Sequence, residues 1–160
     1  MKTLVVYFSY TGNCGLVAGV LKNSLNADVL ELKLTDDRER KGLAKYLWGG
    51  KQVLSHTKPS LKPYKADWES CDLIVIGCPV WAGSLCPALA TFLDETRISG
   101  KKIALFCCHG GAKGRVFEQL KAALTGNTIV AERGFAIPSG VNRGEALENV
   151  RAWAQSLGNV

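Results

Sequence analysis

The sequence lacks the marks of a membrane protein or a secreted protein. No apolar run approaches the ~18 uninterrupted residues that a membrane-spanning helix needs. No signal peptide, with its charged start and apolar core, precedes the first strand-like stretch, which begins at Leu4. We therefore expect a cytoplasmic protein with no membrane partner.

The chain is also poor in the patterns that build zinc sites and disulfide frameworks. It has two histidines, and its six cysteines include no C-x-x-C pair. Two histidines are too few for a typical Cys/His zinc site. Cysteines without a secretory signal are expected to be reduced thiols. We therefore expect neither a metal site nor a disulfide scaffold.

Acidic residues are scarce in one segment of the chain. The whole formal net charge of +6 arises between Lys33 and Lys65, where nine basic residues stand against three acidic ones. A solvated basic surface is the simplest explanation, and a docking surface for an acidic partner or an anionic ligand is the sharper one. No nucleic-acid-binding motif accompanies the charge, so we do not expect a nucleic-acid partner.

Strand-like and helix-like stretches alternate along the 160 residues, 47% of which are hydrophobic. Apolar patterns predict a helix after each of the first four strands, including one capped by Asp36 or Asp37, and a last helix opened by a capping box at Asn142. The alternation predicts an α/β fold in one domain spanning residues 1–160, namely a doubly wound five-stranded parallel sheet with strand order 2-1-3-4-5. The strands are expected at residues 4–8, 28–32 (a sheet edge), 72–77, 102–107 and 129–137, the last bent at Gly134.

The turn after the first strand is rich in hydroxyl groups. Residues 9–14 read SYTGNC, and a helix with one apolar face follows them. Gly12 and Asn13 tolerate positive φ and allow a sharp turn. Free N–H groups and the positive end of the helix dipole would point into this turn. It can therefore bind a phosphate, although it contains no Lys or Arg.

Two common phosphate-binding motifs do not fit this turn. A Walker A loop requires G-x-x-x-x-G-K-[ST] and the dinucleotide fingerprint requires G-x-G-x-x-G, whereas the glycines here fall at 12, 15 and 19 and no Lys follows the first two. The turn resembles instead the phosphate loop of flavodoxins, S/T-x-T-G-x-T, with Cys14 in place of the last hydroxyl residue. An ordinary strand–helix turn is the alternative interpretation.

The loop after the third strand, residues 77–87, reads GCPVWAGSLCP. Trp81 lies between Pro79 and Gly83 and is poorly placed for the core, but its ring could cover a planar ligand. Packing of this ring over the next helix is the alternative. The loop resembles the flavodoxin pattern G-[ST]-P-x-[WY]-x-G, with Cys78 replacing the hydroxyl residue.

The loop after the fourth strand, residues 107–114, reads CCHGGAKG. It resembles the small-residue loop T-S-G-G-G of the family rather than the version that carries a stacking Tyr. Its glycines allow the backbone to approach a ligand closely. His109 offers the one side chain that could hydrogen-bond to such a ligand or partly stack on it, and a plain surface histidine is the alternative.

The resemblance to the short-chain flavodoxins covers nearly the whole chain and implies non-covalently bound FMN. The residues alone indicate only a planar ligand that bears a phosphate. The residues that contact the ring and the phosphate of this ligand are expected in three loops at the carboxyl edge of the sheet. The expected cofactor contacts are Ser9, Tyr10, Thr11, Gly12, Asn13, Cys14, Pro79, Val80, Trp81, Ala82, Gly83, Cys108, His109, Gly110 and Gly111.

Two functions are compatible with the resemblance. We expect an electron carrier that exchanges electrons with a redox partner protein, possibly an acidic one. The alternative is an FMN-dependent oxidoreductase that acts on a quinone, a nitroaromatic or a similar small substrate with an anionic nicotinamide dinucleotide as donor. The third loop lacks the stacking Tyr that many flavodoxins carry, and this absence keeps the alternative open. A module that has lost FMN is a third interpretation, prompted by the two cysteines that replace hydroxyl residues.

All cysteines except Cys71 fall at the carboxyl ends of predicted strands or just beyond them. A small, buriable side chain suits such positions, and we favour that explanation. A thiol pair that exchanges electrons with the flavin is the sharper hypothesis.

Overall fold

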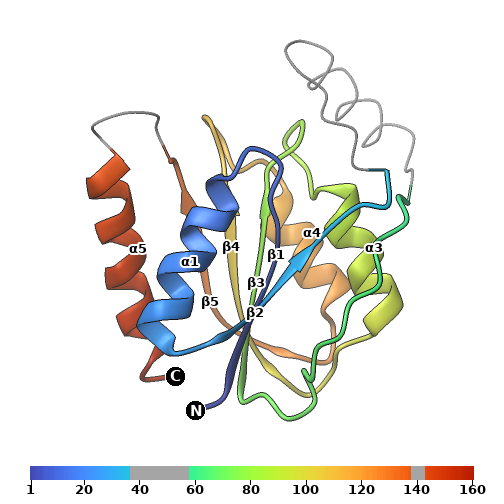
Figure 1. Cartoon of the computed structure of the whole chain (residues 1–160), viewed down its shortest axis with the longest axis horizontal. Coiled ribbons are helices and arrows are strands. Elements are labelled where there is room, and N and C mark those ends of the chain that lie inside the picture. Colours follow the sequence, from blue (N-terminus) through green and yellow to red (C-terminus); the bar gives the residue numbers. More distant parts are fainter. Residues whose placement is uncertain (37–57, 138–142) are drawn as a thin grey trace.

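The computed structural model describes residues 1–36, 58–137 and 143–160. Five parallel strands form one sheet in the order β2-β1-β3-β4-β5 (Figure 1), which confirms the predicted doubly wound, flavodoxin-like architecture. The strands are β1 (Thr3–Phe8), β2 (Asp28–Leu32), β3 (Leu73–Pro79), β4 (Lys102–Cys108) and β5 (Thr128–Phe135).

Helices cover both faces of the sheet (Figure 1). In the described part of the chain, α1 (Asn13–Leu25) and α5 (Arg143–Leu157) lie on one face, and α3 (Pro87–Thr96) and α4 (Val116–Ala123) lie on the other. Pro87 occupies the start of α3, as the sequence predicts, because a first-turn residue needs no N–H donor.

The strands at the centre of the sheet are apolar throughout because each has two buried faces. Leu4, Val6 and Phe8 of β1 pack into the core beneath α3 and α4, whereas Val5 and Tyr7 pack beneath α1 and α5. This alternation is the pleat of a strand that is covered on both sides. The continuous apolar run in the sequence therefore has a direct structural cause.

The second strand forms one edge of the sheet, as predicted. Among the described strands it pairs with β1 alone, and its exposed and buried residues alternate towards the end of the strand. Leu30 and Leu32 are buried, whereas Val29 is exposed. The period-two pattern of this stretch therefore arises because only one face of the strand is covered near its end.

The fifth strand differs from the prediction. It ends at Phe135, and its irregularity lies at Val130 rather than at Gly134, because Ile129 and Ala131 pair with the consecutive residues 103 and 104 of β4. One extra residue in a strand is a β-bulge, which needs no glycine. Gly134 instead leaves room for neighbouring side chains, since a Cβ there would lie 2.5 Å from Lys113 Cδ and 3.1 Å from His109 Nε2.

Several sequence-based predictions fall outside the described residues. They include the helix expected after Asp36 or Asp37, most of the basic segment and the capping residue Asn142. Within the described part of the basic segment, Lys58 pairs with Asp94 at 2.6 Å and Lys33 pairs with Glu31 at 3.5 Å.

The carboxyl ends of the strands meet at the upper end of the molecule in Figure 1, and both chain termini lie at the opposite end. The loops that follow β1, β3 and β4 are therefore brought together at one edge of the sheet. Within the described ranges, no helix is both long and apolar enough to cross a membrane.

Candidate functional site

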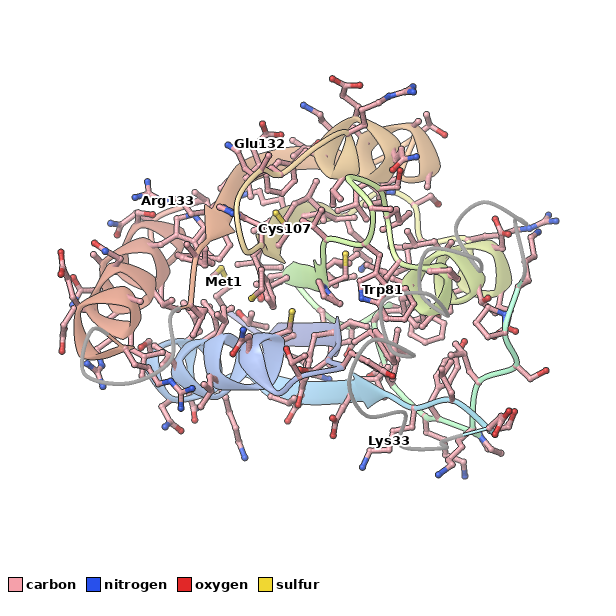
Figure 2. All side chains as sticks on the ribbon, turned by 90° about the horizontal axis from the view of Figure 1, so that it is seen from above. Met1, Lys33, Trp81, Cys107, Glu132 and Arg133 are labelled. Atoms are coloured by element: carbon pink, nitrogen blue, oxygen red, sulfur yellow. The ribbon has the colours of Figure 1, made fainter. Side chains whose placement is uncertain are left out.

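A pocket of about 560 Å³ opens at the carboxyl edge of the sheet. Figure 2 looks down on this edge, with Trp81 and Cys107 labelled near the middle of the molecule. The sides of the pocket come from the three loops that the sequence singles out, together with the segment that follows β5. Its lining residues are Ser9, Tyr10, Thr11, Asn13, Cys14, Pro79, Val80, Trp81, Ala82, Cys108, His109, Gly110 and Ile137.

The first loop places a residue without a side chain at the N-cap of α1. This residue, Gly12, has a φ of 89° and offers no side-chain cap to the helix. The N–H of Gly15 donates to Ser9 Oγ at 3.2 Å, so the Ser9 hydroxyl accepts one hydrogen bond and retains its own proton for another acceptor. Of the two residues that tolerate positive φ, Gly12 adopts it and Asn13 does not. It is instead the first residue of α1.

Electrostatics at this end of the pocket come from backbone dipoles rather than from charged side chains. Neither Lys, Arg, Asp nor Glu is among the described residues that line the pocket. The unsatisfied N–H groups of the first helical turn carry a partial positive charge. The arrangement therefore favours a phosphate without a paired cation.

The second loop is a miniature hairpin. The N–H of Trp81 donates to the carbonyl of Ser84 at 3.1 Å, and the N–H of Ser84 donates back at 2.9 Å. The two residues between them have positive φ, 48° for Ala82 and 70° for Gly83. This is the geometry of a type I′ turn, in which both central residues require positive φ. We call residues 81–84 the Trp81 hairpin.

The Trp81 indole is held by two aromatic rings from the first strand and its loop. Its ring centroid lies 6.0 Å from that of Phe8 and 5.5 Å from that of Tyr10, with interplanar angles of 80° and 85°. Such edge-to-face pairs fix the orientation of a ring. Trp81 is half-buried and lines the pocket, so it combines packing with a surface available to a ligand.

The third loop places His109 between β4 and β5. The N–H of His109 donates to the carbonyl of Phe135 at 3.0 Å, which anchors the backbone at the sheet edge. Its imidazole Nδ1 is buried, and no hydrogen-bond partner is found for it among the described residues. Leaving a buried polar atom unsatisfied costs about 1–3 kcal/mol. A ligand atom that hydrogen-bonds to Nδ1 would remove this cost and so bind more tightly.

The two cysteines that replace hydroxyl residues are turned towards the core. The thiol of Cys14 is 1% exposed and hydrogen-bonds with that of Cys108. The thiol of Cys78 is fully buried and hydrogen-bonds with that of Cys86. Cys14 lines the pocket, but its low exposure leaves its backbone N–H as the group that could meet a phosphate there. Cys78 does not line the pocket.

The same contacts keep these thiols protonated. Burial, followed by the hydrogen bond with Cys108, raises the pKa of Cys14 well above its ordinary value. The hydrogen bond with Cys86 and burial likewise raise the pKa of Cys78. A thiol with a raised pKa is a poor nucleophile and a poor redox group. Among the described residues, no group of three or more His, Cys, Asp or Glu is arranged to hold a metal ion.

The structure gathers most of the predicted contacts around one pocket. Three of the predicted contacts do not line the pocket, namely Gly12, Gly83 and Gly111. The positive φ angles of Gly12 and Gly83 nevertheless shape the turns whose other residues line it. The sequence analysis missed Ile137, which follows the fifth strand at the same edge. The rule that ligands bind beyond the carboxyl ends of parallel strands would have included it. Contact between these residues and a cofactor stays a prediction.

The sequence matches the model of the NADPH-dependent FMN reductases over residues 1–142. The chain belongs to this family. Membership of this family confirms the FMN cofactor that the sequence resemblance implies, and the sheet order confirms the flavodoxin-like fold. No curated protein matches the chain in sequence.

Solved structures show the same fold at low sequence identity. A flavoprotein of Lactobacillus acidophilus NCFM, solved in complex with FMN, is 20% identical, with 83% of this chain and 92% of that chain covered and a TM-score of 0.72. A WrbA-like flavodoxin of Agrobacterium tumefaciens is 16% identical, with coverages of 99% and 95% and a TM-score of 0.67. The two-electron reduced flavodoxin of Megasphaera elsdenii is 16% identical, with coverages of 95% and 99% and a TM-score of 0.55.

Proposed function

We propose that the protein binds FMN in the pocket at the carboxyl edge and reduces it with a nicotinamide dinucleotide. The main support for this proposal is the difference between the two walls of the pocket. Among the described lining residues, one wall holds the Trp81 indole, whereas the third loop contributes Cys108, His109 and Gly110. Because the largest side chain of that loop wall is the imidazole of His109, it would cover less of a bound planar ligand than an indole does and leave room for a second planar ligand on that face.

The residues fit FMN at both ends. The start of α1, the Ser9 hydroxyl and the Thr11 hydroxyl offer donors to a phosphate. Trp81 offers an aromatic surface to the flavin ring, and His109 Nδ1 is a buried polar atom in need of a partner. In the relative from Lactobacillus acidophilus NCFM, the bound ligand is FMN.

FMN accepts two electrons together and passes them on singly or in pairs. In this proposal the protein residues hold the phosphate, orient the ring and exclude water from its Trp81 side. No acidic side chain is among the described residues of the lining, so the anionic donor meets no repulsion there. A quinone, a nitroaromatic or a similar small molecule is the proposed acceptor.

Anaerobic mixing of the FMN-loaded protein with NADPH, and separately with NADH, tests this function. We expect one of the nucleotides to bleach the visible flavin absorbance without any added protein. A flavin that stays oxidised with both nucleotides, but is bleached by dithionite, would contradict the reductase function.

An electron carrier is the second candidate, and the exposed third loop favours it. Lys113 and Arg115 are exposed beside the pocket loops, where they could meet acidic residues of a partner protein. A carrier would be reduced only when its partner is present. The same anaerobic experiment therefore separates the two functions.

A further inference from the structure

The Trp81 hairpin rests on the loop that leads into α4. Its Gly83 carbonyl accepts a hydrogen bond from the Arg115 N–H at 2.8 Å. Gly114 packs so closely on the same peptide that a Cβ at position 114 would lie 2.1 Å from the Gly83 oxygen. Real Cβ atoms are not found at that distance, so any side chain at position 114 would push the hairpin away.

A second contact joins the segment after the hairpin to α4 itself. The N–H of Leu85 donates to Oε1 of Gln119 at 2.8 Å. Gln119 is half-buried, and its helix packs on the sheet through Val116, Phe117 and Leu120. The hairpin is therefore held at two points by an element whose own position is fixed by the core.

We propose that Gly114 and Gln119 are positioning residues that hold Trp81 in place and so set the ring end of the cofactor pocket. This inference rests on the proposed binding of FMN. Neither residue lines the pocket. They act through the Gly83 and Leu85 peptides, whereas Tyr10 and Phe8 hold the indole from the other side.

The phosphate end of the pocket has a separate support. It is built from the start of α1 and from the Gly15–Ser9 hydrogen bond, and no described hydrogen bond joins it to Gly114 or Gln119. Loss of the α4 contacts should therefore weaken the binding of the flavin ring and leave the contribution of the phosphate unchanged. Riboflavin, which has the ring but no phosphate, is the probe for this distinction.

The experiment compares Gly114→Ala and Gln119→Met with Gly100→Ala. The Gly114→Ala change creates the clash, and Gln119→Met removes the acceptor at nearly constant size. Gly100 is the matched control, because its φ is 70° against 55° for Gly114 and a Cβ there would meet nothing within 4 Å. Each protein is titrated with FMN and with riboflavin, well below its melting temperature.

We expect both variants at the α4 contacts to lose about tenfold in affinity for each flavin, which corresponds to about 1.4 kcal/mol. The ratio of the FMN affinity to the riboflavin affinity should stay unchanged. Gly100→Ala should bind as the unchanged protein does. Equal flavin affinities in all four proteins would overturn the inference, and so would a loss confined to FMN. If Gly114→Ala fails to fold, Gln119→Met alone decides.

A readout without flavin separates this inference from the proposed function. Hydrogen exchange of the Trp81 and Ser84 amides, which bond each other's carbonyls, should be faster in both variants than in the control. If the unchanged protein binds neither flavin, the proposed function fails, and unchanged amide exchange would then refute the positioning role by itself.

Discussion

The Trp81 indole stands edge-on to the Tyr10 ring, with centroids 5.5 Å apart and an interplanar angle of 85°. The two residues come from different loops, and both line the pocket. The contact joins the end that is suited to a phosphate with the end that is suited to a ring. Because Trp81 is fixed from that side, its orientation should not depend on a ligand.

Replacement of Trp81 tests its contact with the flavin. Trp81→Ala should weaken FMN and riboflavin alike by about tenfold, since an aromatic pair contributes about 0.5–1.5 kcal/mol beyond the area that it buries. Flavin emission, quenched by the stacked indole, should be recovered in the variant complex. Trp68→Phe is the control, because Trp68 packs on Phe92 and does not line the pocket. Unchanged quenching and affinity in Trp81→Ala would leave the indole only a packing role.

The direction of the Cys14 thiol makes a prediction about phosphate binding. Cys14→Ser restores a hydroxyl of the family motif, but at a side chain that is buried and interacts with Cys108. We expect the FMN affinity to change less than about threefold and the protein to lose about 1–2 kcal/mol of stability, because a more polar group is buried. Titration and urea unfolding measure the two effects, with Cys71→Ser as a buried control far from the pocket. A tenfold gain in FMN affinity would show that the side chain reaches the phosphate.

Buried thiols should make the protein sensitive to alkaline pH. Burial raises the pKa of Cys107 from 9.0 to about 12. Below pH 9 the thiol is protonated in both the folded and the unfolded state, whereas above it the unfolded chain releases the proton first. Stability is therefore lost as the pH rises, by about 1.4 kcal/mol per pH unit from this thiol.

Urea unfolding under reducing conditions at about pH 8 and about pH 10 measures this loss. Cys107→Ala removes the titrating group, so the variant should lose about 1.4 kcal/mol less than the unchanged protein between the two pH values. Equal losses would mean that Cys107 ionises as readily in the folded protein as in the unfolded chain.

Backbone strain in the Trp81 hairpin makes a further prediction. Ala82 has a φ of 48°, which an L-residue other than Asn, Asp or Gly adopts at a cost of about 1 kcal/mol. Ala82→Asn creates the Asn-Gly pair that type I′ turns prefer, so it should stabilise the protein by about 0.5–1 kcal/mol. Thermal unfolding provides the measurement, and Ala82→Val, with a branched side chain that tolerates positive φ poorly, should destabilise. A lower melting temperature for the Asn variant would refute the strain.

The fold and the place of the pocket followed from the sequence because the signals for them are local and strong. Apolar strands that are buried on both faces must lie in a covered parallel sheet, and the carboxyl ends of such strands share one edge. Residues 9–14, 79–83 and 108–111 could therefore be assigned to one site without knowledge of any contact. The bulge at Val130 was missed, because one extra residue in a strand leaves no distinct pattern in the sequence.

Side-chain directions and contacts between distant segments could not be predicted in the same way. A residue at the start of a helix can face either the ligand or the core, and the sequence does not show that Cys14 pairs with Cys108. The close approach of Gly114 to Gly83 depends on two loops that are far apart in the chain. Such contacts become visible only once the elements are packed.

The most direct test of the account is an equilibrium titration with FMN and riboflavin, in the unchanged protein and in the double variant Ser9→Ala/Thr11→Ala. Because hydrogen bonds to a charged group contribute about 1.5–3 kcal/mol each, the double variant should lose about 100-fold in FMN affinity and little in riboflavin affinity. Thr96→Ala/Ser156→Ala, at helix hydroxyls remote from the pocket, should lose neither. Equal losses of the two ligands in the Ser9/Thr11 variant, or a preference for riboflavin in the unchanged protein, would contradict a phosphate site at the start of α1.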